Sequence, residues 1–258
     1  PDTASSLNNL AYTYAGLAQY EKALPLRLRA LKIHEKVLGP EHPDTALSLN
    51  NLAATYIDLA QYEKALPLQQ RTLAIYEKVL GPDHPDTALS LHNLAFTYSD
   101  LAQHNKALEL NLRALVVYEK VVGSDHPDTA LSLNNLAQTY RNLGQYDKAL
   151  EVQFRGLAIY EKVLGPDHPD TALSLSNLAG IYSSLAQHEK ALSLELRALE
   201  IYEKILGPDH PVTALSLNTL AHTYADLAQH EKAFSKQKTA YAIGVRLVGS
   251  EMCIRDSS

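Results

Sequence analysis

A proline that recurs at a fixed distance restricts the possible folds of this chain more than any other feature. The distance is 42 residues at every step, between Pro1, Pro43, Pro85, Pro127, Pro169 and Pro211. A constant period of this size indicates an array of stacked structural repeats rather than one globule around a central core. Length alone would also suit other classes of helical repeat, so the residue pattern inside the repeat must decide.

The first half of each repeat has the pattern of an amphipathic helix. In the second repeat it begins with Pro-Asp-Thr, and proline in the first turn beside a capping Asp or Thr is typical of a helix start. Leu49, Leu52, Ala53 and Tyr56 follow at spacings of three and four residues, so they form one apolar stripe. We therefore expect a helix from Pro43 that buries this stripe.

The second half of each repeat predicts another helix. Residues 62–81 read YEKALPLQQRTLAIYEKVLG, with apolar residues at helical spacing and no alternation of period two. Gly81 suits the end of this helix, and Pro82 stops it. Each repeat is therefore predicted to be a helical hairpin, and strands are not expected.

A leucine, a small residue, a tyrosine and an alanine recur at constant offsets in every repeat. The six sets are Leu10-Ala11-Tyr14-Ala23, Leu52-Ala53-Tyr56-Ala65, Leu94-Ala95-Tyr98-Ala107, Leu136-Ala137-Tyr140-Ala149, Leu178-Ala179-Tyr182-Ala191 and Leu220-Ala221-Tyr224-Ala233. This set resembles the tetratricopeptide repeat pattern, in which the small residues let two helices approach closely. Six copies in register make the resemblance specific.

A longer segment, LAIYEKVLGPDHPDTALSLNNLA, is similar to the repeats of kinesin light chains and their bacterial relatives. The resemblance extends from residue 1 to about residue 243. Two departures from the ordinary tetratricopeptide repeat stand out, because Leu49 replaces the usual tryptophan and Gln69 stands where an aromatic residue is common. We therefore expect leucines to pack the core in place of these aromatic residues.

The resemblance implies an all-α fold, a right-handed α-α superhelix of six helical hairpins. We expect one solenoid domain over residues 1–246, with repeats 1–42, 43–84, 85–126, 127–168, 169–210 and 211–246. In that family the first helices line a concave groove that takes up extended peptide segments of partner proteins. A protein–protein interaction scaffold is thus the implied function.

The groove stripe follows from helical geometry. At about 100° per residue, Asn50, Ala54 and Ile57 lie roughly 100–140° away from the buried stripe. Equivalent positions vary between repeats, whereas the scaffold positions hardly change. Variation alone is weak evidence, because second-helix positions taken as exposed, namely Arg27, Gln69, Asn111 and Glu195, vary as well. The predicted groove residues are Asn8, Asn9, Tyr12, Asn50, Asn51, Ile57, His92, Asn93, Phe96, Asn134, Asn135, Gln138, Arg141, Asn177, Asn218 and His222.

Asparagines dominate this set and allow two interpretations. An amide offers a donor and an acceptor, so a column of asparagines can hold the backbone of an extended chain. The same amides can instead bond to the adjacent repeat. The sequence leaves both roles open.

Repeated histidines and arginines are interpreted as structural. His42, His84, His126, His168 and His210 each precede a helix-starting proline, and repeats about 10 Å apart cannot bring such residues within the roughly 2 Å that zinc needs. A capping or turn role is expected for them, with no metal site. Arg29, Arg71, Arg113, Arg155 and Arg197 are expected to pair with acidic residues such as Glu35, Glu77 and Glu119 of neighbouring repeats.

No catalytic, phosphate-binding or dinucleotide motif occurs, so we expect neither an enzyme nor a cofactor. The net charge is −6 and the charges are interspersed, which disfavours nucleic acid, although RNA binding by helical repeats stays open as an alternative. No apolar run is long enough to span a membrane. The single cysteine favours a cytoplasmic location.

The last residues depart from the repeat. Residues 247–257 read LVGSEMCIRDS and resemble a translated sequencing adaptor, so residues 247–258 are predicted to be a non-native tail on a chain cut at both ends. We expect the uncapped terminal repeats to favour self-association. The alternative to peptide binding is therefore a structural spacer or self-association module within a larger signalling protein whose catalytic domain is missing.

Overall fold

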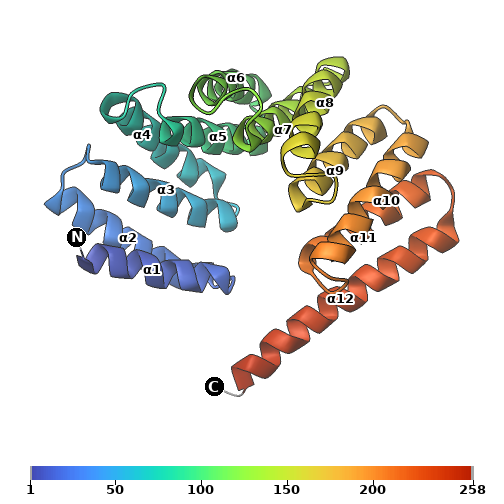
Figure 1. Ribbon diagram of the computed structural model, residues 1–258. Coiled ribbons are helices and arrows are strands. Elements are labelled where there is room, and N and C mark those ends of the chain that lie inside the picture. Colours follow the sequence, from blue (N-terminus) through green and yellow to red (C-terminus); the bar gives the residue numbers. More distant parts are fainter. Residues whose placement is uncertain (1, 257–258) are drawn as a thin grey trace. The chain divides into compact units, whose positions relative to one another are not determined.

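A computed structural model describes residues 2–256 of the chain, with side chains up to residue 244. The described residues form twelve α-helices and no strand, which confirms an all-α fold of six helical hairpins (Figure 1). The helices are α1 (Asp2–Gly16), α2 (Tyr20–Val37), α3 (Pro43–Asp58), α4 (Tyr62–Val79), α5 (Pro85–Asp100), α6 (His104–Val121), α7 (Pro127–Asn142), α8 (Tyr146–Val163), α9 (Pro169–Ser184), α10 (His188–Ile205), α11 (Pro211–Asp226) and α12 (His230–Asp256).

The chain divides into two compact units of three repeats each, Pro1–Ser124 and Asp125–Ser258. Within each unit every helix packs against the next, and the first helices of neighbouring repeats also touch, as α1 with α3 and α7 with α9. The assignment of residues 1–246 to one solenoid domain stays a prediction. The predicted non-native tail lies where side chains fall outside the described residues, although the backbone of α12 is helical to Asp256.

The first helices of repeats two to six begin at a histidine cap followed by proline. His42 Nδ1 accepts a hydrogen bond from the backbone N–H of Asp44 at 3.1 Å, and Pro43 then needs no partner because it has no N–H. His84, His126, His168 and His210 cap α5, α7, α9 and α11 in the same way. The predicted helix-start role of these histidines is confirmed.

Each core cluster lies among three consecutive helices. Leu49 and Leu52 of α3 are almost completely buried, and they pack against Leu31 of α2 and Ile75 of α4. The apolar stripe predicted for the first helix is therefore the face on which the preceding repeat stacks. Because one stripe contacts both its own hairpin and its neighbour, no repeat buries its core alone.

In α2, α4, α6, α8 and α10, the side chain four residues after the recurring alanine lies inside the stack, whereas its counterpart in α12, Gln237, is exposed. We had expected Arg27, Gln69, Asn111 and Glu195 to be exposed, but this is wrong, since all four are buried. Their polar atoms bond to the first helices beside them, as when Gln69 Nε2 donates to the Asn93 carbonyl oxygen at 3.0 Å. A hydrogen-bonded polar side chain thus fills the place of the missing aromatic residue. The expectation that leucines alone replace the aromatic residues in the core is therefore wrong.

The turn inside each hairpin contains a residue in the left-handed region. Ala18, Ala60, Ala102, Ala186 and Ala228 have φ values between 52° and 57°, and Gly144 occupies the same place with φ 70°. The turn is fixed by a hydrogen bond that closes the preceding helix, such as Gln61 N–H to the Tyr56 carbonyl oxygen at 2.7 Å. Alanine is strained in this conformation because its Cβ crowds the backbone, whereas glycine is not.

The left-handed turn position therefore offers a stabilising substitution. Changing Ala186 to glycine should raise the free energy of unfolding by about 1 kcal/mol, because it removes the Cβ strain. The reverse change Gly144→Ala should lower it by a similar amount, since a Cβ there meets open space and only the backbone conformation opposes it. Urea denaturation of both variants measures the two values; a destabilised Ala186→Gly protein would contradict the assignment.

Glu195 is a carboxyl group enclosed by the stack. It is 3% exposed, and its Oε1 accepts a hydrogen bond from Thr223 Oγ1 at 3.0 Å, while no partner is found for Oε2 within the described residues. Burial raises the pKa of Glu195, and the Thr223 hydrogen bond only partly offsets this rise. Repeats two and four carry the neutral residues Gln69 and Gln153 at the same place.

Stability should consequently depend on pH through Glu195. The folded chain holds this proton at pH values where the unfolded chain has lost it, so stability falls as pH rises from the ordinary carboxyl pKa through the raised one. Glu195→Gln should remove that loss and be more stable than wild type at about pH 8 but not at about pH 4. Denaturant melts across this range measure it, with the exposed Glu200→Gln on the same helix as control; parallel profiles for Glu195→Gln and wild type would refute the assignment.

Candidate functional site

The exposed stripe of the first helices forms the candidate site, and we call it the groove face. It comprises the fifth, ninth, twelfth and fifteenth residues of each repeat, counted from the proline, and the eighth where its side chain is not buried. A column of leucines at the fifth position is 44–66% exposed, namely Leu47, Leu89, Leu131, Leu173 and Leu215. We did not predict these leucines, although they lie seven residues before the twelfth position and therefore on nearly the same side of the helix.

The predicted groove residues fall into three groups in the structure. Those at the surface are Asn9, Tyr12, Phe96, Asn218 and His222. Those that are half-buried are Asn8, Asn50, Asn51, Ile57, Asn93, Asn135, Gln138, Arg141 and Asn177. The remaining two, His92 and Asn134, are buried.

His92 and Asn134 contact the interior and not the groove face, contrary to expectation. His92 Nδ1 lies 2.8 Å from Asn111 Oδ1, and burial lowers the pKa of His92 so that the ring stays neutral. Asn134 Oδ1 accepts hydrogen bonds from Gln153 Nε2 at 2.8 Å and from Ser174 Oγ at 3.2 Å. Both side chains turn inward because the eighth position borders the buried stripe, and both serve packing.

Other asparagines bond to a neighbouring repeat without being enclosed. Asn93 Nδ2 donates to Asn50 Oδ1 at 3.1 Å, and Asn8 Nδ2 donates to Ser48 Oγ at 3.4 Å. Each amide has donor and acceptor capacity beyond these bonds. The half-buried asparagines therefore link repeats and still present polar atoms at the groove face.

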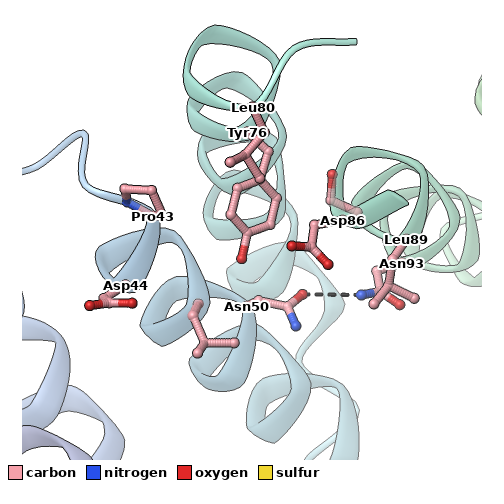
Figure 2. Close-up of a pocket in the computed structure, with 10 residues that line it drawn as sticks. Pro43, Asp44, Asn50, Tyr76, Leu80, Asp86, Leu89 and Asn93 are labelled. Atoms are coloured by element: carbon pink, nitrogen blue, oxygen red, sulfur yellow. Dashed lines mark hydrogen bonds between the residues drawn. The ribbon is translucent and has the colours of Figure 1, made fainter. Parts of the chain in front are cut away.

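A hollow of about 260 Å³ opens on the groove face between α3 and α5 (Figure 2). Leu47 and Leu89 form apolar walls, and the hydrogen-bonded pair Asn50–Asn93 closes one side. Tyr76 extends into the hollow from α4. Its other lining residues are Pro43, Asp44, Leu80, Asp86 and Ser90. The hollow thus lies between two consecutive first helices, α3 and α5, and the last turn of α4 also lines it.

The electrostatic character of this hollow is negative. Burial raises the pKa of the Tyr76 hydroxyl, and the carboxylates of Asp86 and Asp44 raise it further. Figure 2 shows the Tyr76 hydroxyl directed into the hollow on the side of Asp86. An anion would be repelled here, whereas a cation or a hydrogen-bond donor would be attracted.

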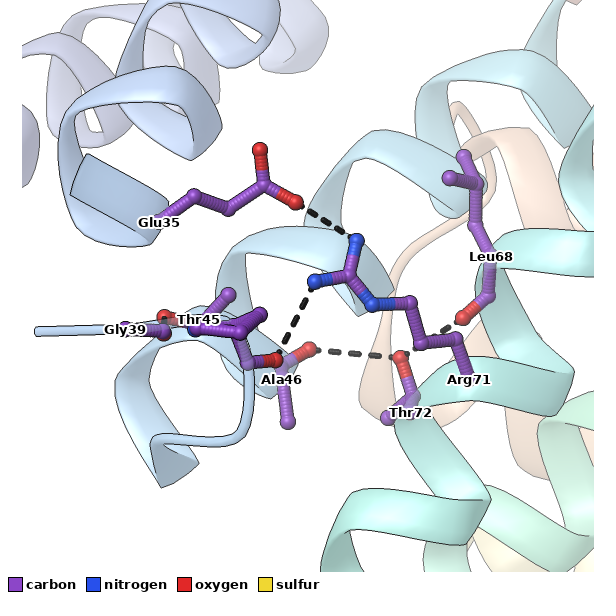
Figure 3. Close-up of polar contacts among 8 residues, drawn as sticks. Glu35, Gly39, Thr45, Ala46, Leu68, Arg71 and Thr72 are labelled. Atoms are coloured by element: carbon purple, nitrogen blue, oxygen red, sulfur yellow. Dashed lines mark hydrogen bonds and ion pairs between the residues drawn. The ribbon is translucent and has the colours of Figure 1, made fainter.

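The face formed by the second helices is different, because its acidic residues are neutralised by cations of the next repeat. Arg71 Nη1 lies 2.5 Å from Glu35 Oε1 and its Nη2 donates to the Pro40 carbonyl oxygen at 3.1 Å (Figure 3). The same ion pairing links Arg113 with Glu77, and Arg197 with Glu161. The inter-repeat ion pairs predicted for the arginine column are confirmed at these three junctions.

The second unit carries related groups on its own groove face. Tyr160 of α8 has its pKa raised by burial, by Asp170 and by Asp128, as Tyr76 does in the first unit. Arg141 extends over Gly180 of α9, where a Cβ would collide with its Nη1. Gly180 replaces the larger residues found at the twelfth position of other repeats, and this space accommodates the arginine.

The described part of the chain has neither a metal-binding cluster nor a membrane-spanning helix. There, no three His, Cys, Asp or Glu side chains are grouped so that they could hold a metal ion. No helix in the same part is both long and apolar enough to cross a membrane.

Comparisons with known proteins identify the repeat. The tetratricopeptide repeat family matches residues 2–78, 48–120, 101–162, 143–204 and 196–244. No curated protein sequence matches the chain. A solved structure described as a kinesin light chain of nearly identical TPR-like repeats, from Podosopora anserina, is 31% identical, with 78% of this chain and 94% of that chain covered and a TM-score of 0.69.

Two further solved structures share the fold at lower identity. BtubC (BKLC) from P. vanneervenii is 18% identical over 95% of this chain and 92% of its own, with a TM-score of 0.66. The apo form of RapI is 18% identical over 96% and 85%, with a TM-score of 0.74. Since the family matches span residues 2–244 and all six hairpins, the chain belongs to the tetratricopeptide repeat family, with repeats of the kinesin light chain-like type.

Proposed function

We propose that this protein is a non-catalytic scaffold that binds an extended segment of a partner protein along the groove face. The observation that carries the proposal is the column of half-exposed leucines beside half-buried asparagines. These leucines lie at the same position of successive first helices, and about half of the surface of each is in contact with water. A bound partner segment would cover that surface and use the amides for its backbone.

The spacing of the repeats suits an extended chain. Packed helices lie about 8–10 Å apart, and a polyproline II chain advances about 3.1 Å per residue with three residues per turn. Every third side chain of such a segment would therefore meet the next leucine. The varied twelfth position, with Tyr12 and Phe96 in one unit and Gln138 and His222 in the other, would then select among partner side chains.

The fold itself is compatible with partner binding. A Rap protein solved in complex with Competence and Sporulation Factor has a TM-score of 0.63 to this chain at 17% identity. That complex belongs to the Rap protein and supports the proposal only by showing a partner bound to this fold.

Self-association is a second candidate, favoured by one observation. Leu10 of α1 is 47% exposed, whereas its counterpart Leu52 is 1% exposed, and Phe234 and Tyr241 of α12 are 69% and 75% exposed. These outer faces would pair between copies as neighbouring repeats pair within the chain. Sedimentation velocity over a range of concentrations tests it, and a strictly monomeric species at the highest concentration would exclude it.

Replacing groove leucines should weaken peptide binding without unfolding the chain. The full chain is screened against a displayed library of random peptides, and the enriched peptides are measured again with the double variant Leu47→Ser, Leu89→Ser. Serine occurs at this position in repeat one as Ser5, so the helix tolerates it. Affinity should fall at least about tenfold because apolar contact area is lost.

A matched control separates the groove face from general surface effects. Val116 is 62% exposed on α6, and repeat one carries Lys32 at the same position, so Val116→Lys should bind like wild type. Far-UV circular dichroism checks that all variants keep their helices. Equal binding by wild type and the leucine double variant would show that the groove face is not the site, and an empty screen would count against peptide binding altogether.

A further inference from the structure

The carboxylates around the hollow between α3 and α5 have no cation of their own. Glu35 pairs with Arg71 and Glu41 with Lys78, but no lysine or arginine of the described chain pairs with Asp44 or Asp86. Each aspartate carboxylate does approach its capping histidine, at 3.7 Å from Nδ1. That nitrogen already accepts the backbone N–H of the aspartate, so it has no proton to donate.

The start of the helix does not require aspartate at this position. An acidic residue in the first turn favours a helix through the helix dipole. Repeat six, however, carries Val212 there, and α11 still begins at Pro211 with His210 as its cap. The two negative charges are therefore not required to start the helix.

A hydroxyl on the floor of the hollow also lacks a protein partner. Tyr76 is 9% exposed, its hydroxyl points into the hollow, and no hydrogen bond to it is found among the described residues (Figure 2). The apolar walls formed by Leu47 and Leu89 suit methylene groups and not a hydrated ion. The hollow thus offers apolar sides, a hydroxyl acceptor and the carboxylate of Asp86 beside that hydroxyl, while Asp44 lines it from the first turn of α3.

We propose that this hollow receives a lysine or arginine side chain of the partner segment, with its aliphatic stem between Leu47 and Leu89 and its charge paired with Asp86, in a negative field to which Asp44 adds. The inference rests on the proposed function, because the side chain belongs to a segment lying on the groove face. A long side chain with a terminal cation satisfies every group in the hollow, whereas an acidic side chain meets only repulsion. The volume of about 260 Å³ accommodates such a side chain.

The experiment uses the full chain and four displayed libraries that differ only at a central fixed residue, which is lysine, arginine, glutamine or glutamate, between random flanks. Wild type should enrich lysine- and arginine-centred peptides at least about tenfold over glutamine-centred ones, and glutamate-centred ones least. The double variant Asp44→Asn, Asp86→Asn should lose this preference. The affinity of lysine-centred peptides should also fall with added salt, which would barely affect glutamine-centred ones.

The control removes the same charge from the same helices. Asp58 and Asp100 lie at the other ends of α3 and α5, so Asp58→Asn, Asp100→Asn changes the net charge equally and should keep the preference. Methyl NMR signals of Leu47 and Leu89 should shift when a lysine-centred peptide is added to wild type, and circular dichroism verifies that both variants are folded.

The outcomes separate this inference from the proposed function. Peptides that bind without preference for a cation overturn the inference and leave groove binding intact. A preference that survives in the Asp44, Asp86 variant places the cation elsewhere and also overturns it. Loss of preference in both double variants shows a general charge effect and contradicts the hollow as its source. If no peptide binds wild type, both the inference and the proposed function fail.

Discussion

The structure depends on the contact between the second helix of one repeat and the first helix of the next. Leu31 of α2 meets Leu49 and Leu52 of α3, and the same pairing recurs at later junctions within each unit, as with Leu73 and Leu91. Since one apolar stripe serves both its own hairpin and its neighbour, a hairpin gains stability only when it is stacked. This shared stripe fixes which side of each first helix is buried, and it therefore also fixes the opposite side as the groove face.

Charge is distributed unequally between the two faces of the stack. On the second-helix face, acidic residues such as Glu35 and Asp83 lie within ion-pairing distance of a cation from the following repeat. On the groove face, Asp86 lies beside the Tyr76 hydroxyl and Asp44 lines the same hollow, with no such cation. Exposed ion pairs add little stability individually, but here they neutralise one face. The hollow on the groove face keeps its negative charge beside the exposed side chains of Leu47 and Leu89.

Most of the fold could be predicted because strict repetition makes periodicity unambiguous. The helix starts at Pro43 and its equivalents, the buried stripe with Leu49 and Leu52, and the histidine caps all follow from local rules. The candidate site was harder to predict, because the eighth position lies at the border between buried and exposed sides. His92 and Asn134 are buried beside their partners Asn111 and Gln153, while Asn50 bonds to Asn93 and stays half-buried. The hollow at Tyr76 needs three helices to be placed together, and sequence spacing does not contain that information.

The varied buried polar position has a consequence for how the chain assembles. Repeats this similar have nearly interchangeable apolar surfaces, so leucine packing alone does not distinguish a correct neighbour from a wrong one. The buried polar side chains add little distinction, because Gln153 bonds to Ser174 and Glu195 to Thr223, and a serine or a threonine recurs at these two positions in most other repeats. The partner side chains for this position are therefore nearly as interchangeable as the apolar surfaces. The order of the repeats is therefore set by the covalent connection between one hairpin and the next, and not by a selective surface at each junction.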